Sequence, residues 1–169
     1  MNVVLGIDPG LAATGYGVLA VQGSRVRRIA YGVIRTPAGA EHGSRLLALS
    51  DRLRAIVTEY RPHEAAIEEL FFSRNVRSAL PVAQARGVII LVLAQCGVAC
   101  SEYSPGTVKL AVAGHSRAPK GQIIRSVRLV LGLDDEPGSD HSADALAVAL
   151  CHIQHAPVRA AVARAAAAR

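Results

Sequence analysis

Short apolar runs separated by polar turns make up the beginning of the chain. Residues 3–8 form a β-rich run that ends at the carboxylate of Asp8, and two further runs cover about 16–21 and 27–36. The turn Gln22-Gly23-Ser24 separates the second and third runs, which is typical of a hairpin. The pattern predicts three consecutive antiparallel strands.

Helical and extended patterns alternate in the rest of the chain. Residues 44–61 place leucine, isoleucine and valine at helical spacing before Pro62, and residues 65–68 are typical of a short buried strand. The later predicted elements are a long helix at 78–95 with Pro81 in its first turn, a strand at 98–103, short helices at 105–113 and 121–131, and a helix at 140–155.

The helix predicted at 78–95 is apolar on every face between residues 88 and 94. A helix of this kind is buried on all sides, either within the core or against a second subunit.

This order of elements predicts an α/β fold. Its mixed five-stranded sheet combines three antiparallel N-terminal strands with parallel crossovers and is flanked by helices. No repeat or linker divides the 169 residues, which fit one domain. We assign residues 1–156 to this domain. Residues 157–169 are an Ala/Arg-rich tail with little to pack against, which we expect to fray or to touch DNA.

The charge of the chain favours an anionic partner. The formal net charge is +6 at pH 7 and the isoelectric point is near 9.8, a balance for which nucleic acid is the commonest partner. Apolar residues make up 51% of the sequence and charged residues 19%, which excludes a disordered charged tail protein. Only two of the 19 Lys and Arg residues are lysines, Lys109 and Lys120.

Neither a membrane segment nor a secretory signal is evident. The apolar run 88–94 is far shorter than the ~20 residues that span a bilayer, and residues 1–5 lack a basic region and a cleavage site. Three cysteines without paired spacing argue against a zinc site or a disulfide framework. We therefore expect a cytoplasmic protein.

Three carboxylates occupy positions at which separate elements can bring them together. Asp8 and Glu68 end two strands, and ligand sites of mixed α/β sheets gather at such carboxyl ends. Asp144 lies near the start of the final helix, and His141 and Asp140 precede it by three and four residues on the same helical face.

Each of these residues alone has an ordinary explanation. Asp8 could be an ordinary turn residue, and Glu68 could form a solvated pair with its neighbour. Asp140 could be the N-cap of the last helix, and His141 could be an exposed residue of its first turn. Together they favour a shared site, because clustered carboxylates repel unless a cation binds, and hard oxygen ligands suit Mg²⁺ or Mn²⁺. Two such ions would outweigh three carboxylates by about one positive charge, which suits a phosphodiester substrate.

At these positions the sequence resembles the RuvC-type Holliday junction resolvases. One motif alone is weak, but five in order across about residues 2–155 are specific. They are Gly6-Ile7-Asp8-Pro9-Gly10, Thr14-Gly15-Tyr16-Gly17, Ala66-Ile67-Glu68, Gln84-Ala85-Arg86-Gly87 and Ala143-Asp144-Ala145-Leu146-Ala147.

The resemblance implies a ribonuclease-H-like fold and a homodimer that makes paired symmetric nicks across four-way junction DNA, with a branch-migration motor as a further partner. It makes Asp8, Glu68, His141 and Asp144 the catalytic, metal-binding residues, with Asp140 as second choice for the metal. We expect two Mg²⁺ or Mn²⁺ ions bridged by Asp8, and in-line attack by a metal-activated water that leaves a 5′ phosphate and a 3′ hydroxyl.

Many relatives in this family carry aspartate where this chain has His141, although a histidine variant also occurs. Because imidazole is a softer ligand than carboxylate, we expect Mn²⁺ to support activity at least as well as Mg²⁺.

Candidate DNA-binding residues lie in two regions. Lys109 and Lys120 match lysines that the family places near the DNA backbone, and ammonium groups suit phosphate. Phe71, Arg74 and Arg77 fall on a basic aromatic segment just after Glu68, where a ring can wedge against unstacked bases. Core or dimer packing remains an alternative for the two phenylalanines at 71 and 72, of which we favour Phe71 for DNA.

Three other functions remain open at this point. An actin-like ATPase or sugar kinase also has a glycine-rich phosphate-binding hairpin, but such proteins generally need two related lobes, and no repeat is present. A related nuclease would act on RNA or hybrids. A non-catalytic junction-binding protein would be indifferent to Asp8→Asn.

Overall fold

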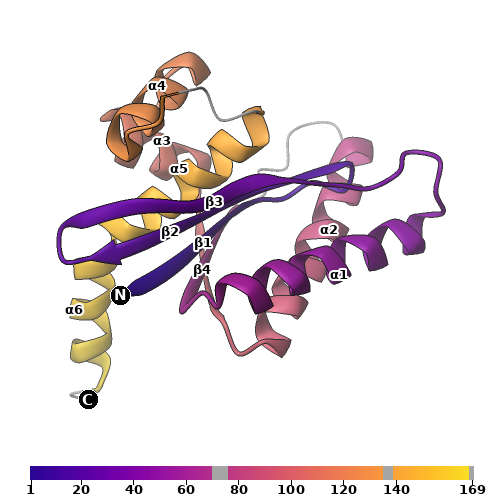
Figure 1. The fold of residues 1–169 in the computed structure, drawn as a ribbon, viewed down its shortest axis with the longest axis horizontal. Helices are drawn as coiled ribbons and strands as arrows, with labels where there is room; N and C mark the ends of the chain where they lie inside the picture. The colour runs from indigo at the N-terminus through magenta and orange to yellow at the C-terminus, as the bar shows by residue number, and fades with distance from the viewer. Residues whose placement is uncertain (70–75, 135–138, 168–169) are drawn as a thin grey trace.

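The computed structural model describes residues 1–69, 76–134 and 139–167, with the backbone alone at 76–78, 162–163 and 166–167. The elements in chain order (Figure 1) are β1 (Asn2–Asp8), β2 (Ala13–Gln22), β3 (Arg25–Arg35), α1 (His42–Tyr60), β4 (Glu64–Glu68), α2 (Val76–Gln95), β5 (Ala99–Tyr103), α3 (Pro105–Ala113), α4 (Lys120–Leu131), α5 (Asp140–Gln154) and α6 (Ala156–Ala167). Up to α5 this is the predicted order.

The strands form one mixed sheet in the order β3-β2-β1-β4-β5. β1 pairs antiparallel with β2, and β2 pairs antiparallel with β3 across a turn at Gly23, whose φ of 60° lies in the left-handed region. β4 runs parallel to β1, and β5 runs parallel to β4. Because parallel strands end at the same edge of a sheet, β1 and β4 bring their last residues together.

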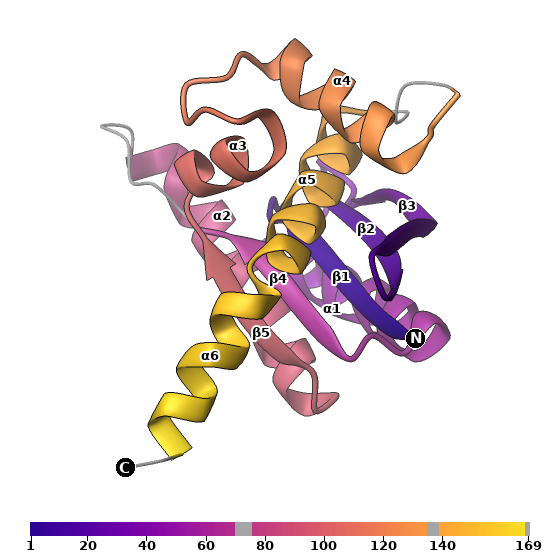
Figure 2. The same cartoon turned by 90° about the vertical axis from the view of Figure 1, so that its left-hand side faces the viewer.

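Helices cover both faces of this sheet and give the molecule three layers (Figures 1 and 2). α1 and α2 lie on one face, and α3, α4 and α5 lie on the other. Alternate residues of β1 point to the two faces, so Leu5 belongs to the core under α1 and α2 while Val4 belongs to the core under α5. The period of two in the strand thus serves two separate cores.

Helix α5 lies directly on the backbone of β1 and β2, as Figure 2 shows. A Cβ placed on Gly15 would collide with the backbone of His141, and one placed on Gly6 would collide with the backbone of Ala145. Glycine is therefore required at both positions for the helix to approach the sheet this closely. Gly15 is also the pairing partner of Asp8, so this contact brings the start of α5 to the end of β1.

The N-cap of α5 is Ser139, so the alternative explanation of Asp140 as the cap is wrong. Ser139 has extended backbone, and its Oγ accepts the N–H of Ser142 at 3.2 Å. This leaves Asp140 in the first turn, where a carboxylate also interacts favourably with the positive end of the helix.

Helix α2 begins earlier than predicted. It begins at Val76, so Pro81 lies inside the helix and not in its first turn. Within the single chain Ile89 and Leu93 are fully buried but Leu91 is 56% exposed, so the core alone does not cover every face of the helix. No helix in the described part of the chain is long and apolar enough to span a membrane.

Candidate active site

Two carboxylates meet at the edge of the sheet where β1 and β4 end. Ile7 pairs with Ile67 in the parallel register, so the next residues, Asp8 and Glu68, stand side by side at the ends of the two strands. Both side chains are partly buried. The strand pattern predicts this placement, and the structure agrees with it.

The first turns of α5 supply the other predicted residues. His141 Nδ1 lies 2.6 Å from Asp8 Oδ2. An ionised carboxylate accepts hydrogen bonds and does not donate them, so the imidazole donates from Nδ1 and Nε2 is left for another partner. The His141 side chain is 47% exposed and that of Asp8 is 15% exposed, so the contact lies at the mouth of the site.

Lys120, the first residue of α4, forms ion pairs with two carboxylates of α5. Its Nζ lies 3.1 Å from Asp140 Oδ2 and 3.2 Å from Asp144 Oδ2. The Lys120 side chain is 50% exposed, the Asp140 side chain 66% and the Asp144 side chain 33%. The lysine thus bridges the first and second turns of α5 at the solvent boundary.

Burial and the neighbouring carboxylates raise the pKa values of Asp8 and Glu68. Burial, together with the charges of Asp8 and Asp144, raises the pKa of Glu68 to about 7. Burial also raises the pKa of Asp8, and the hydrogen bond from His141 opposes this. Among the described residues Glu68 has no ion pair or hydrogen bond of its own, whereas Asp8 has His141 and Asp144 has Lys120. Glu68 is therefore the carboxylate of the cluster whose negative charge is least compensated, and it holds a proton to a higher pH than an ordinary glutamate.

The donor set of this cluster fits a hard divalent cation in charge and chemistry. In the present arrangement, no three His, Cys, Asp or Glu side chains of the described residues are grouped closely enough to hold a metal ion. Two of the carboxylates have partners within the protein in this arrangement, Asp144 with Lys120 and Asp8 with His141.

The predicted DNA-binding residues divide into two groups. Lys120 contacts Asp140 and Asp144 directly, whereas Lys109 is half-buried on α3 and its positive charge lowers the pKa of Glu68. Phe71 and Arg74 lie outside the described residues, and at Arg77 the structure describes only the backbone of α2.

A second histidine–carboxylate cluster, which sequence reasoning missed, lies at the other end of α5. His152 is 1% exposed, and its Nε2 lies 2.7 Å from Glu64 Oε2 at the start of β4. The Tyr103 hydroxyl lies 3.0 Å from His152 Nδ1. Arg159 of α6 donates to Glu64 at 2.9 Å and to the Tyr103 hydroxyl at 3.0 Å.

A single proton arrangement satisfies this second cluster. Arg159 donates to the Tyr103 hydroxyl, that hydroxyl donates to Nδ1 of His152, and Nε2–H donates to Glu64, so the imidazole is neutral. Burial lowers the pKa of His152. Burial would raise the pKa of Glu64, but His152 and Arg159 outweigh it and hold that pKa below its ordinary value. The signal in the sequence was a histidine that directly follows the apolar segment 145–151 of the last predicted helix.

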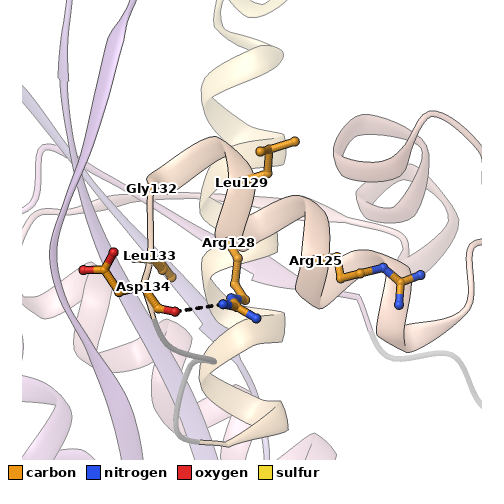
Figure 3. A pocket seen from close by; sticks show the side chains of 6 residues that line it. All are labelled: Arg125, Arg128, Leu129, Gly132, Leu133 and Asp134. Atoms are coloured by element: carbon orange, nitrogen blue, oxygen red, sulfur yellow. Dashed lines mark hydrogen bonds between the residues drawn. The ribbon is translucent and has the colours of Figure 1, made fainter.

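A hollow beside α4 is separate from the acidic cluster (Figure 3). It is lined by Arg125, Arg128, Leu129, Gly132, Leu133 and Asp134. Arg128 donates to the backbone carbonyl of Asp134 at 2.8 Å, and Arg125 points away from that contact. No residue of the acidic cluster lines this hollow, so the two are separate features of the surface.

A mixed sheet of this order with converging acidic residues at the β1 and β4 ends defines the ribonuclease-H-like class of nucleases, as predicted. Comparison with known proteins identifies the family. The family described as crossover junction endodeoxyribonuclease RuvC matches residues 4–152. The chain belongs to this family, and the predicted endonuclease class is confirmed.

Individual relatives agree with this assignment. The crossover junction endodeoxyribonuclease RuvC of Heliobacterium modesticaldum is 52% identical over 149 residues, covering 88% of this chain and 92% of that protein. The structure of Thermus thermophilus RuvC is 36% identical, with a TM-score of 0.85 over 92% of this chain and 96% of that one. T. thermophilus RuvC in complex with a Holliday junction substrate matches with a TM-score of 0.88 at 36% identity, covering 94% of this chain and 96% of that one.

Proposed function

We propose that this endonuclease resolves four-way DNA junctions by paired symmetric nicks, with Asp8, Glu68, His141 and Asp144 as its catalytic residues. The observation that carries the proposal is geometric: Asp8 and Glu68 stand side by side at the ends of β1 and β4, and His141 of α5 lies 2.6 Å from Asp8. The junction is the substrate bound in the T. thermophilus structure, which this chain matches over 94% of its length.

The cluster is proposed to hold Mg²⁺ or Mn²⁺ through these three carboxylates, with His141 as a fourth ligand and Asp140 as the second choice. A bound divalent ion lowers the pKa of a coordinated water and stabilises the charge that develops on the phosphate. The protein itself positions the ligands. The ends of β1 and β4 hold Asp8 and Glu68, and the close contacts of Gly6 and Gly15 set the distance of α5 from these strands.

Lys109 and Lys120 are proposed to bind the DNA backbone beside this site. Both lie close enough to influence Glu68 electrostatically, so a phosphate held by either is near the carboxylates. Phosphate contacts of this kind make binding weaken as salt rises. Phe71, Arg74 and Arg77 remain our candidates for contacts at the branch point.

A homodimer is proposed because a junction with two-fold symmetry requires two nicks on symmetry-related strands. The exposed face of α2 suits the interface. Leu80 is 55% exposed and Leu91 is 56% exposed on this face, and a Cβ on the intervening Gly87 would meet no atom within 4 Å. Apolar side chains that are open in one subunit can pack against their copies in the other.

The decisive experiment incubates the protein with a mobile four-way junction and Mg²⁺ or Mn²⁺ and maps the nicks at nucleotide resolution. We expect nicks at symmetry-related positions on two strands, with 5′ phosphate and 3′ hydroxyl ends. Single unpaired nicks, or faster cleavage of RNA–DNA hybrids or structured RNA than of the junction, would contradict the proposal.

A further inference from the structure

Lys120 contacts Asp144, one of the carboxylates proposed to bind the metal ion. Its ammonium group lies 3.2 Å from one oxygen of Asp144 and 3.1 Å from one oxygen of Asp140. Asp144 is one of the three carboxylates that fit a divalent cation, whereas Asp140 is the most exposed member of the group. The same lysine is therefore bound to a metal-ligand candidate and to a neighbour that holds it there.

An ammonium group in this place opposes metal binding for two reasons. It occupies an oxygen of Asp144 that a metal would coordinate, and it places a positive charge next to the incoming ion. Like charges a few Å apart in a partly buried site repel each other strongly. Lys120 and a metal ion at Asp144 are therefore competitors.

The position of Lys120 allows it to leave. It is the first residue of α4, after Pro119, which caps the helix without a side-chain hydrogen bond. Half of its side chain is exposed, and a lysine side chain can swing by rotation about its own bonds without moving the helix. The neighbouring DNA phosphate of the proposed function is an alternative anion for it.

We propose that Lys120 is a built-in counter-ion that keeps divalent metal out of the site until DNA arrives, and that Asp140 is its anchor and not a metal ligand. When a DNA phosphate takes the ammonium group, the oxygen of Asp144 is released for the metal. Metal and DNA then bind cooperatively, because each removes an obstacle to the other, and this coupling is reciprocal. The inference rests on the proposed function, since it concerns the order in which that site is filled.

The test compares Mn²⁺ binding in the absence of DNA for the wild-type chain, Lys120→Gln and Arg125→Gln, by electron paramagnetic resonance of free Mn²⁺. Arg125→Gln is the matched control, because it removes one positive charge from the same exposed helix at a residue that faces the separate hollow (Figure 3). We expect Lys120→Gln to bind Mn²⁺ about tenfold more tightly than the other two.

Thermal unfolding gives a second reading of the same competition. Without metal, Lys120→Gln should unfold at a lower temperature than the wild type, since its carboxylates lose their counter-ion. Added Mn²⁺ should stabilise it more than it stabilises the wild type. Equal or weaker Mn²⁺ affinity in Lys120→Gln, including undetectable binding, overturns the inference. The junction-cleavage experiment on the wild type tests the proposed function separately, so the two failures are distinguishable.

Discussion

Helix α5 carries a histidine–carboxylate pair at each end, and the two pairs have opposite character. His141 and Asp8 meet at an exposed edge, beside a carboxylate whose pKa is raised to about 7. His152 and Glu64 meet at the other end, where the imidazole is 1% exposed and an arginine and a tyrosine complete the network. The first cluster has unsatisfied charge, whereas the second is balanced.

This difference separates a site for chemistry from a structural contact. A balanced cluster fixes how elements pack, here α6 against α5 and the sheet. An unbalanced cluster costs stability in the free protein and is compensated when its ligand binds. The following predictions test this distinction, beginning with the largest expected effect.

Replacing Asp8 by Asn should abolish junction cleavage while DNA binding is retained. Removal of a metal-binding carboxylate costs several kcal/mol of transition-state stabilisation, which corresponds to about a thousandfold in rate. Single-turnover cleavage of a labelled junction measures the loss, and a mobility shift measures binding. Glu64→Gln is the matched control at the balanced end and should cleave at nearly the wild-type rate. Equal losses in both variants would show that the two ends do not differ.

His152→Ala should destabilise the fold far more than His141→Ala. The first removes a buried imidazole and leaves Tyr103 and Glu64 with Arg159 as their only remaining partner among the described contacts, at a cost of about 2–4 kcal/mol. The second removes an exposed contact, whose loss costs about 0–1 kcal/mol. Urea unfolding of the metal-free variants gives both free energies. If His141→Ala lost more free energy of unfolding than His152→Ala, the structural contact would lie at the His141 end of α5 and the prediction would be wrong.

The two ends should respond to pH with opposite sign in the metal-free protein. The raised pKa of Glu68 means that the folded state holds its proton, so the contribution of Glu68 to stability falls as pH rises from 4.5 through about 7. The lowered pKa values of Glu64 and His152 work the other way, because the unfolded chain takes up protons first as pH falls.

Urea unfolding at a series of pH values between about 5 and 8 resolves the two contributions. In Glu68→Gln the part of the profile that falls toward neutral pH should shrink to the contribution of Asp8, whose pKa is also raised, and in Glu64→Gln it should remain. An unchanged slope in Glu68→Gln would contradict the assignment of the least compensated charge to this carboxylate.

The smallest expected effect concerns the choice of metal. Among the described residues His141 uses Nδ1 for Asp8 and leaves Nε2 free, whereas both nitrogens of His152 are occupied. We expect Mn²⁺ to support cleavage at least as well as Mg²⁺, and His141→Asp to shift the preference toward Mg²⁺ by a few-fold, about 1 kcal/mol. Cleavage rates at saturating concentrations of each metal measure it. A strong preference of the wild type for Mg²⁺ would argue against ligation by His141.

The sequence predicts that Asp8 and Glu68 lie at one edge of the sheet, and the structure agrees because the evidence for this placement is local. Asp8 and Glu68 each end an apolar run, and strands of that kind end at a shared sheet edge whatever the rest of the chain does. The spacing from His141 to Asp144 is a property of one helix. Both patterns can be recognised from neighbouring residues in the sequence, without knowing which distant residues are in contact.

The balanced cluster could not be predicted in the same way. Tyr103, His152 and Arg159 lie on three elements, and no periodic pattern relates them to Glu64. The ion pair from Lys120 to Asp140 has the same origin, since it depends on how α4 is placed against α5. The choice of Ser139 over Asp140 as the N-cap is a matter of one residue, at which two good capping side chains compete.

The contact of α5 with Gly6 and Gly15 has a consequence for how the enzyme tolerates change. At these two points backbone meets backbone, so the distance between α5 and the strand that carries Asp8 is set by the absence of a side chain on the glycine. Any side chain there would push the start of α5, and His141 with it, away from Asp8. We therefore expect even Gly15→Ala to be tolerated worse than substitutions that resize side chains elsewhere in the core.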